Sequence, residues 1–124
     1  MDLVKQFVRQ GMAFEAAYKD GGWDRLRDFY SPDIVYAVSN MPFHCEINGI
    51  DNFLAGFVRA TDGFDKKCVR EINVGAFTLV QEDHKVLFHS FIRFTRDDHP
   101  PIQAGLWVIA IFENGLFSHL TDLY

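Results

Sequence analysis

From Lys67 onward the chain is built of four long stretches rich in apolar residues, and turn signals separate each stretch from the next. The stretches cover residues 68–82, 86–96, 102–113 and 116–124. Asn114-Gly115 separates the last two, and both residues tolerate the positive φ of a tight β-hairpin turn. Strands this long usually bend, and Gly75 and Gly105 inside them are predicted bulge or bend sites. We therefore predict a strongly curved, mostly antiparallel sheet.

The N-terminal half shows the spacing of helices instead. Apolar residues recur at helical intervals as far as Tyr18, and Gly21-Gly22 follow where a helix C-terminus favours glycine. A shorter apolar stripe stops at Ser31-Pro32, because the residue before proline avoids helical angles. The predicted elements are helices over residues 2–20 and 22–30, a strand in DIVYAV, the irregular stretch SNMPFHCE, and a third helix from the cap Asn48 to near Asp62.

Helices first and an antiparallel sheet after them predict one α+β domain over residues 1–124, with the three helices packed on the concave face of the sheet. Aromatic residues make up 15% of the chain and charged residues only 23%. A curved sheet closed by helices leaves a cone. The interior of this cone must be unusually aromatic, or aromatic residues must line an apolar cavity in it. A small hydrophobic molecule is the expected ligand of that cavity.

Composition excludes several other classes of function. The formal charge is −5, and lysines and arginines are scattered rather than clustered, so nucleic acid is a poor partner. The sequence shows neither a signal peptide nor an apolar run long enough to span a membrane, so we expect a cytoplasmic protein without a membrane partner. Cys45 and Cys68 lack CxxC spacing and are expected to be reduced thiols. The five histidines lack metal-ligand spacing, and no cofactor motif is present, so neither a metal nor a cofactor is predicted.

Three motifs carry a family resemblance: WDRLRDFYSPDIVY, INGIDNFLAGF and the final hairpin NGLFSHLTDLY. In this order they resemble the nuclear-transport-factor-2-like superfamily, and within it the SnoaL-like group of polyketide cyclases and ketosteroid isomerase relatives. The resemblance covers essentially the whole chain. It implies a cone-shaped fold, and cyclisation or isomerisation by cofactor-free proton transfer as the nearest reaction class. A non-catalytic module that binds a ligand or a protein partner is the alternative that the same resemblance leaves open.

Particular branches of the superfamily are disfavoured by the residues at their catalytic positions. Where the isomerases carry a tyrosine and two acids, this chain has Phe14, Val38 and, nearby, Trp107, so steroid isomerisation is excluded. The positions of the catalytic histidines in scytalone-dehydratase-like enzymes correspond to residues near Ile72 and Gln103 of this chain. Their dehydration reaction is therefore disfavoured. The Arg and Asp of limonene-epoxide-hydrolase-like enzymes are replaced by Ser90 and Ile92.

Asp122 in LTDLY is the leading catalytic candidate. Period-two alternation places it on one strand face with Leu120 and Tyr124, and the resemblance implies that this face points into the cone. Burial among aromatic rings would raise the pKa of the carboxyl group towards the range of a general base at neutral pH. The alternative is that Asp122 is hydrated near the terminus, or that it pairs with Arg70 or Arg93.

His44 is the second proton-transfer candidate, because the resemblance places MPFHCE at the mouth of the cavity. Tyr18, Tyr36 and Trp107 could supply hydrogen-bond donors and stacking surfaces to a planar ligand, although such residues more often pack in a core. The remaining predicted ligand-binding residues are Phe57, Ser90, Leu120 and Tyr124.

The opposite, convex face of the sheet is also predicted to be apolar. It should hold Leu87, His89, Phe91 and Arg93 from one strand, and Phe117, His119 and Leu123 from another. A monomer would leave much of this surface in water, which is unusual above a few hundred Å². We therefore expect a homodimer formed through the convex face.

Overall fold

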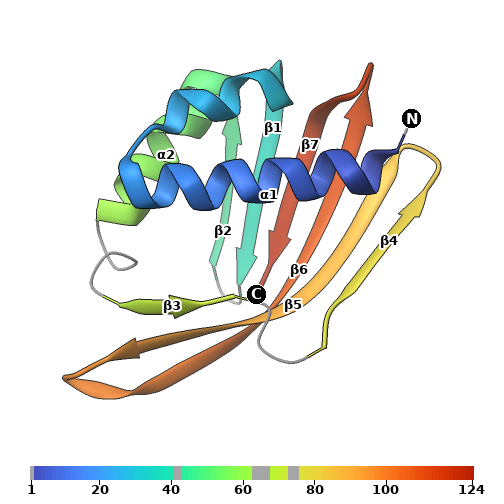
Figure 1. The fold of residues 1–124 in the computed structure, drawn as a ribbon. Helices are drawn as coiled ribbons and strands as arrows, with labels where there is room; N and C mark the ends of the chain where they lie inside the picture. The colour runs from blue at the N-terminus through green and yellow to red at the C-terminus, as the bar shows by residue number, and fades with distance from the viewer. Residues whose placement is uncertain (1, 41–42, 63–67, 73–75) are drawn as a thin grey trace.

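The computed structural model describes residues 2–40, 43–62, 68–72 and 76–124 of the chain. It is an α+β fold in which the helices lie against one face of a seven-stranded sheet (Figure 1). The described elements, in chain order, are α1 (Leu3–Asp20), the 3-10 helix η1 (Trp23–Phe29), β1 (Tyr30–Asn40), β2 (Phe43–Asn48), α2 (Ile50–Asp62), β3 (Val69–Glu71), β4 (Thr78–Glu82), β5 (Lys85–Arg96), β6 (His99–Glu113) and β7 (Leu116–Leu123). None of the described helices is long and apolar enough to cross a membrane.

The strands are ordered β2-β1-β7-β6-β5-β3, and β4 also pairs with β5. Most neighbours are antiparallel as predicted, but β1 and β7 pair in parallel. The stretch predicted as one strand over residues 68–82 contributes the two separate strands β3 and β4, which pair with different parts of β5. The predicted bend at Gly75 lies outside the described residues.

The helix boundaries follow from their caps. Asp2 caps α1 by accepting a hydrogen bond from the Lys5 backbone N–H at 2.9 Å, and Gly21 ends it with a φ of 78°. The predicted cap of α2 is wrong by one position. Asn48 is the last residue of β2, and Gly49, with a φ of 88°, takes the turn into the helix and accepts the first helical hydrogen bond from Phe53.

The predicted hairpin turn at Asn114-Gly115 is confirmed, with φ angles of 52° and 79°. Of the bulge or bend predicted at Gly105, the bulge is absent, because this residue pairs with Phe91 in a part of the β5–β6 ladder whose register is continuous from Lys85 to Phe94. A side chain at Gly105 would meet the Phe91 ring at 3.4 Å. This is an ordinary van der Waals distance, so Gly105 simply lies beside the Phe91 ring on the face away from the helices.

A bulge in β7 corrects one further prediction. Phe112 pairs with Phe117 and Ile111 with His119, so Ser118 is an extra residue in the ladder. Phe117 is fully buried in the core instead of lying on the face predicted to be convex, whereas His119 is exposed on that face. Leu116 lies opposite the exposed Glu113, so it does not share the face of Asp122.

Aromatic side chains form a cluster between the helices and the sheet. Phe53 and Phe117 are fully buried, and the ring of Tyr30 contacts both, at centroid distances of 4.7 and 5.2 Å. Phe57 of α2 joins this cluster through Phe53, at 4.6 Å. Part of the aromatic excess of the sequence is thus found in the core.

Replacing residues on either side of the bulge tests its position. Phe117→Ala should lower the free energy of unfolding by about 3–5 kcal/mol, because it leaves a cavity in the core. His119→Ala should change it by no more than about 0.5 kcal/mol, because the side chain is exposed. Urea denaturation measures both values, and equal effects of the two substitutions would contradict the bulge.

Candidate functional site

Two of the residues predicted from the sequence meet on the neighbouring strands β1 and β7. The parallel register of β1 and β7 sets Tyr36 beside Leu120 and Val38 beside Asp122. Tyr36 and Asp122 therefore share a face, and the Tyr36 hydroxyl donates a hydrogen bond to Oδ2 of Asp122 at 2.6 Å. This face is the one against which the helices pack, because the Tyr36 ring stacks on Phe53 of α2 at 4.9 Å.

The surroundings change the titration of both groups. Burial raises the pKa of Asp122 to about 6, and the hydrogen bond from Tyr36 partly opposes that rise. Burial is also the main cause that raises the pKa of Tyr36 above its ordinary range, followed by the nearby negative charge of Asp122. At neutral pH the phenol is therefore a hydrogen-bond donor, and the carboxyl group titrates close to the working range of a general base.

The arginines named as alternative partners of Asp122 are engaged elsewhere. Arg70 forms an ion pair with Glu15, with an N–O distance of 2.7 Å. Arg93 lies 3.7 Å from Glu71 and donates a hydrogen bond to Gln103. The polar partner that the structure gives the carboxylate of Asp122 is the phenol of Tyr36.

Three more predicted ligand-binding residues lie on the same face of the sheet. Leu120 is buried beside Tyr36. Ser90 is buried on β5, and its hydroxyl donates to the Phe91 carbonyl oxygen at 3.3 Å. Tyr124 extends the pairing with β1 through its backbone N–H, and its side chain is close enough to raise the pKa of Tyr36 further.

The predicted residues on the helices lie at different distances from this pair. Phe57 contacts the Tyr36 ring at 6.3 Å and continues the aromatic surface beside it. The guanidinium carbon of Arg70 lies over the Tyr18 ring, 4.9 Å from the ring centroid. The structure therefore gathers Phe57 at the Tyr36–Asp122 pair and places Tyr18 beside β3.

Trp107 and His44 lie on the opposite face of the sheet from Asp122. The prediction that they lie beside the bound ligand is therefore wrong. Trp107 is next to Val108, which pairs with Asp122, so alternation directs Trp107 to the face away from the helices. There it is 43% exposed and packs on His89 at 4.3 Å. His44 is an exposed residue of β2 whose Nδ1 lies 2.6 Å from the Ser39 hydroxyl.

Two residues near the site were not identified from the sequence as functional. Gln10 of α1 is buried and donates a hydrogen bond from Nε2 to the Tyr30 hydroxyl at 2.5 Å. Burial raises the pKa of Tyr30 above its ordinary range, and the charge of Asp122 adds to this effect. The available signal was an amide side chain between Phe7 and Phe14 on the apolar stripe of the helix.

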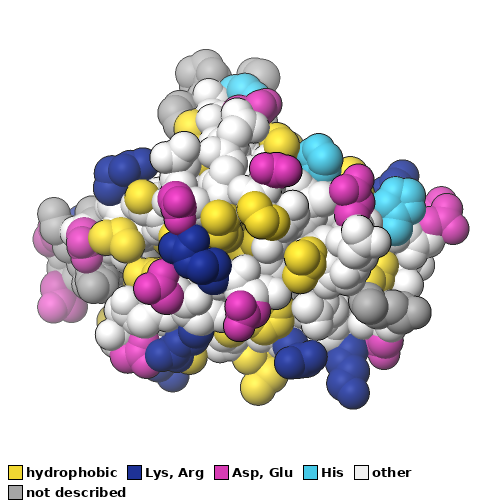
Figure 2. All heavy atoms as spheres, turned by 90° about the horizontal axis from the view of Figure 1, so that it is seen from above, with side chains coloured by type: hydrophobic (Ala, Val, Ile, Leu, Met, Phe, Trp, Pro, Cys, Tyr) yellow, Lys and Arg dark blue, Asp and Glu magenta, His cyan; other side chains and the backbone are white. Residues whose placement is uncertain are grey.

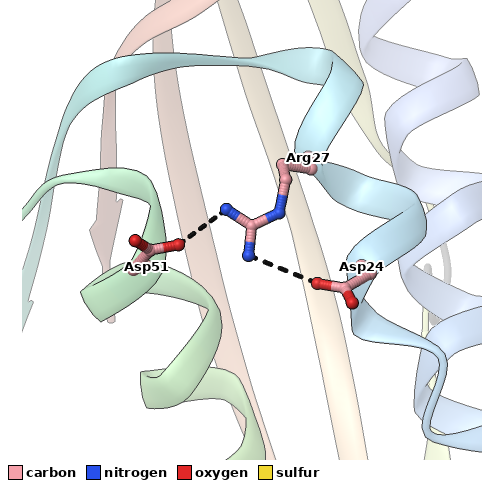
Figure 3. Close-up of polar contacts among 3 residues, drawn as sticks. All are labelled: Asp24, Arg27 and Asp51. Carbon is pink, nitrogen blue, oxygen red and sulfur yellow. Dashed lines mark hydrogen bonds and ion pairs between the residues drawn. The ribbon is translucent and has the colours of Figure 1, made fainter.

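A separate, open groove of about 370 Å³ lies between η1 and α2. It is lined by Gly21, Gly22, Trp23, Asp24, Arg27, Asp51, Leu54, Ala55 and Val58, none of which was predicted to bind the ligand. Arg27 joins the two helices there, with hydrogen bonds of 2.6 Å to Asp51 and 3.3 Å to Asp24 (Figure 3). All three side chains are substantially exposed, so these ion pairs stabilise the contact only weakly.

Charge is mixed on the surface. Acidic and basic side chains are interspersed on the face seen from above in Figure 2. Among the described residues, no three His, Cys, Asp or Glu side chains are grouped as a metal site would require.

Comparison with known proteins identifies the fold. No protein-family model and no curated protein sequence matches the chain. Solved structures match it over nearly its whole length. An NTF2-like protein from Anabaena variabilis is 14% identical with a TM-score of 0.74, and the match covers 95% of this chain and 85% of that one. A candidate polyketide cyclase from Xanthomonas campestris pv. campestris is 14% identical with a TM-score of 0.62. The match covers 99% of this chain and 93% of that one. TerC, co-crystallised with polyporic acid, is 9% identical with a TM-score of 0.69. The match covers 96% of this chain and 91% of that one.

The chain therefore has the nuclear-transport-factor-2-like fold, as its motifs predicted. At these sequence identities the likeness establishes the fold alone. The function has to be argued from the residues on the helix-facing side of the sheet.

The raised pKa of Asp122 predicts a pH-dependent stability. In the unfolded chain this carboxyl group has its ordinary pKa of 3.8, so between about pH 4 and 6 the folded state binds more protons. Ionisation of Asp122 should thus lower the free energy of unfolding as the pH rises through this window, by on the order of 1–3 kcal/mol. Relative to the wild type, Asp122→Asn should become more stable over the same window in urea titrations.

Tyr36→Phe tests the contribution of the hydrogen bond to the pKa of Asp122. It removes the hydrogen bond that lowers the pKa of Asp122, so that pKa should rise above about 6. Carbon-13 NMR of the carboxyl group reports the value directly. Stability curves of the wild type and Asp122→Asn that stay parallel through this pH window would show that the carboxyl group is not desolvated.

Proposed function

We propose that this protein binds a small hydrophobic molecule between its helices and the concave face of a curved sheet, and that it transfers a proton on that molecule without a cofactor. Asp122 is the general base and Tyr36 the hydrogen-bond donor. The observation that carries the proposal is the 2.6 Å hydrogen bond between these side chains in a site where burial raises the pKa of the acid to about 6. One protein of this fold is described as a candidate polyketide cyclase and another was co-crystallised with polyporic acid, which agrees with this class of chemistry.

The hydrogen bond gives the pair a mechanism for activation. A bound carbonyl compound would accept the Tyr36 hydrogen bond in place of Asp122. The carboxylate would then lose a contact that lowers its pKa and become a stronger base. Asp122 would remove a proton from the carbon next to the carbonyl group, while Tyr36 stabilises the charge that develops on the carbonyl oxygen. Phe53, Phe57 and Leu120 supply the apolar surroundings that this proton transfer requires.

The proposed activity can be tested with a simple enolisable aromatic ketone. Proton NMR in D₂O should show that the protein accelerates exchange of the α-protons of 2-tetralone for deuterium. Asp122→Asn should slow the catalysed exchange by about 10²–10⁴-fold, the usual contribution of a general base. Glu46→Gln is the matched control, because Glu46 is an exposed acid on β2, two strands from Asp122, and its replacement should leave the rate unchanged.

The non-catalytic alternative gives a different result in the same samples. Amide chemical shifts that change around Tyr36 on addition of 2-tetralone, without any catalysed exchange, would indicate a ligand-binding module. A catalysed rate that Asp122→Asn leaves unchanged would reject Asp122 as the base.

We further propose that the convex face pairs with a second copy of the chain. Phe91 and Trp107 are 36% and 43% exposed on adjacent strands, with His89 between them. Leu87 and Ile109 continue the same face without a charged side chain. This aromatic patch, with Arg93 at its edge on β5, can be paired with itself about a two-fold axis.

Light scattering tests the assembly. At micromolar concentration the wild type should have about twice the 14.3 kDa mass of one chain. Trp107→Glu should give the monomer mass, because two carboxylates would face each other in the apolar contact. Met12→Glu, which charges a more exposed apolar position on α1, should keep the dimer. A wild-type mass of one chain would reject the proposal.

A further inference from the structure

The helix-facing side of the sheet holds a second partly buried polar group, which the proton transfer does not use. The Arg70 guanidinium on β3 donates two parallel hydrogen bonds to Glu15 of α1, from Nη1 to Oε2 at 2.7 Å and from Nη2 to Oε1 at 2.9 Å. The Arg70 side chain is 13% exposed and that of Glu15 is 32% exposed. In Figure 1, β3 lies below the C-terminal half of α1.

Aromatic rings complete the surroundings of Arg70. Its guanidinium carbon lies 4.9 Å from the ring centroid of Tyr18 and 5.6 Å from that of Phe14. A planar fork with two donors facing outward and aromatic rings against its surface is the arrangement with which proteins recognise carboxylates. Here a carboxylate of the chain itself occupies the fork.

Arg70 and Asp122 are connected by one continuous aromatic surface. The Phe14 ring, which faces Arg70, contacts Phe57 at 5.1 Å, and Phe57 contacts Tyr36 at 6.3 Å. Tyr36 in turn holds Asp122. A cationic group and the proposed base thus lie at the two ends of the same apolar wall.

We propose that the ligand is a hydrophobic carboxylic acid whose carboxylate displaces Glu15 from Arg70. This inference rests on the proposed function, because it names the class of molecule that the same site binds. The charges also orient the ligand. An ionised Asp122 repels a second carboxylate, whereas Arg70 attracts it, so the acid end lies at β3 and the apolar body extends towards Tyr36. Glu15 can release Arg70 because its own side chain already reaches water.

A purely structural role for this ion pair makes a different prediction. β3 has only three residues, and the pair with Glu15 fastens it to α1. If that were its whole purpose, weakening the pair would reduce stability without distinguishing an acid from a neutral ligand. Charge-dependent binding is therefore the measurement that separates the two roles.

Calorimetric titration with 2-naphthoate and its neutral analogue 2-naphthamide tests the inference. The wild type should bind the acid more tightly than the amide. Glu15→Gln removes the competing charge and should tighten 2-naphthoate binding by about tenfold, the scale of one charge-assisted hydrogen bond, while leaving 2-naphthamide unchanged. Arg70→Gln should reduce the affinity for the acid to that for the amide.

The wild type gives an independent measurement that does not depend on the folding of the variants. The NMR signal of the Arg70 side-chain Nε–H should shift with 2-naphthoate and stay in place with 2-naphthamide. Equal affinities for the two compounds, or no effect of Glu15→Gln on the acid, would overturn the inference. Binding of 2-naphthamide with shifts around Tyr36 would even then support the hydrophobic site of the proposed function, and its absence would count against that function separately.

Discussion

The parallel pairing of β1 with β7 is the constraint on which the site depends. It joins a strand from the helical half of the chain to the last strand, and its register sets Val38 beside Asp122. Tyr36, one strand away, can then reach the carboxylate from the same face. The helices add Phe53 and Phe57 above this pair, and the resulting burial accounts for the raised pKa of the acid.

Local patterns in the sequence were sufficient for most of the architecture. Helical spacing and a C-terminal glycine defined α1, and Asn114-Gly115 defined the last hairpin, because each signal acts over a few residues. The motif LTDLY also identified Asp122 correctly as a residue of the helix-facing side. Its partner could not be derived in the same way. The contact between Tyr36 and Asp122 joins residues 86 positions apart, and only the pairing of the strands brings them together.

The errors arose where one residue changes the face of a strand. Trp107 and His44 each adjoin a residue of the inner face, so an assignment displaced by one position moves them to the opposite side. Phe117 was misplaced for a related reason, since strict alternation from Asp122 ignores the extra residue at Ser118. Composition indicated an aromatic interior, but it could not distinguish a ring in the core from the exposed rings of Phe91 and Trp107.

The irregularity at Ser118 also determines what the end of the chain presents to the interior. The turn at Asn114-Gly115 fixes the start of the ladder, with Phe112 opposite Phe117. Counted from there in an unbroken ladder, the even-numbered positions of β7 would point outward, and Thr121 rather than Asp122 would point inward. The inward position of the acid is thus a matter of parity: a single surplus residue, placed early in the strand, decides whether this scaffold carries an ionisable group inside or only a hydroxyl.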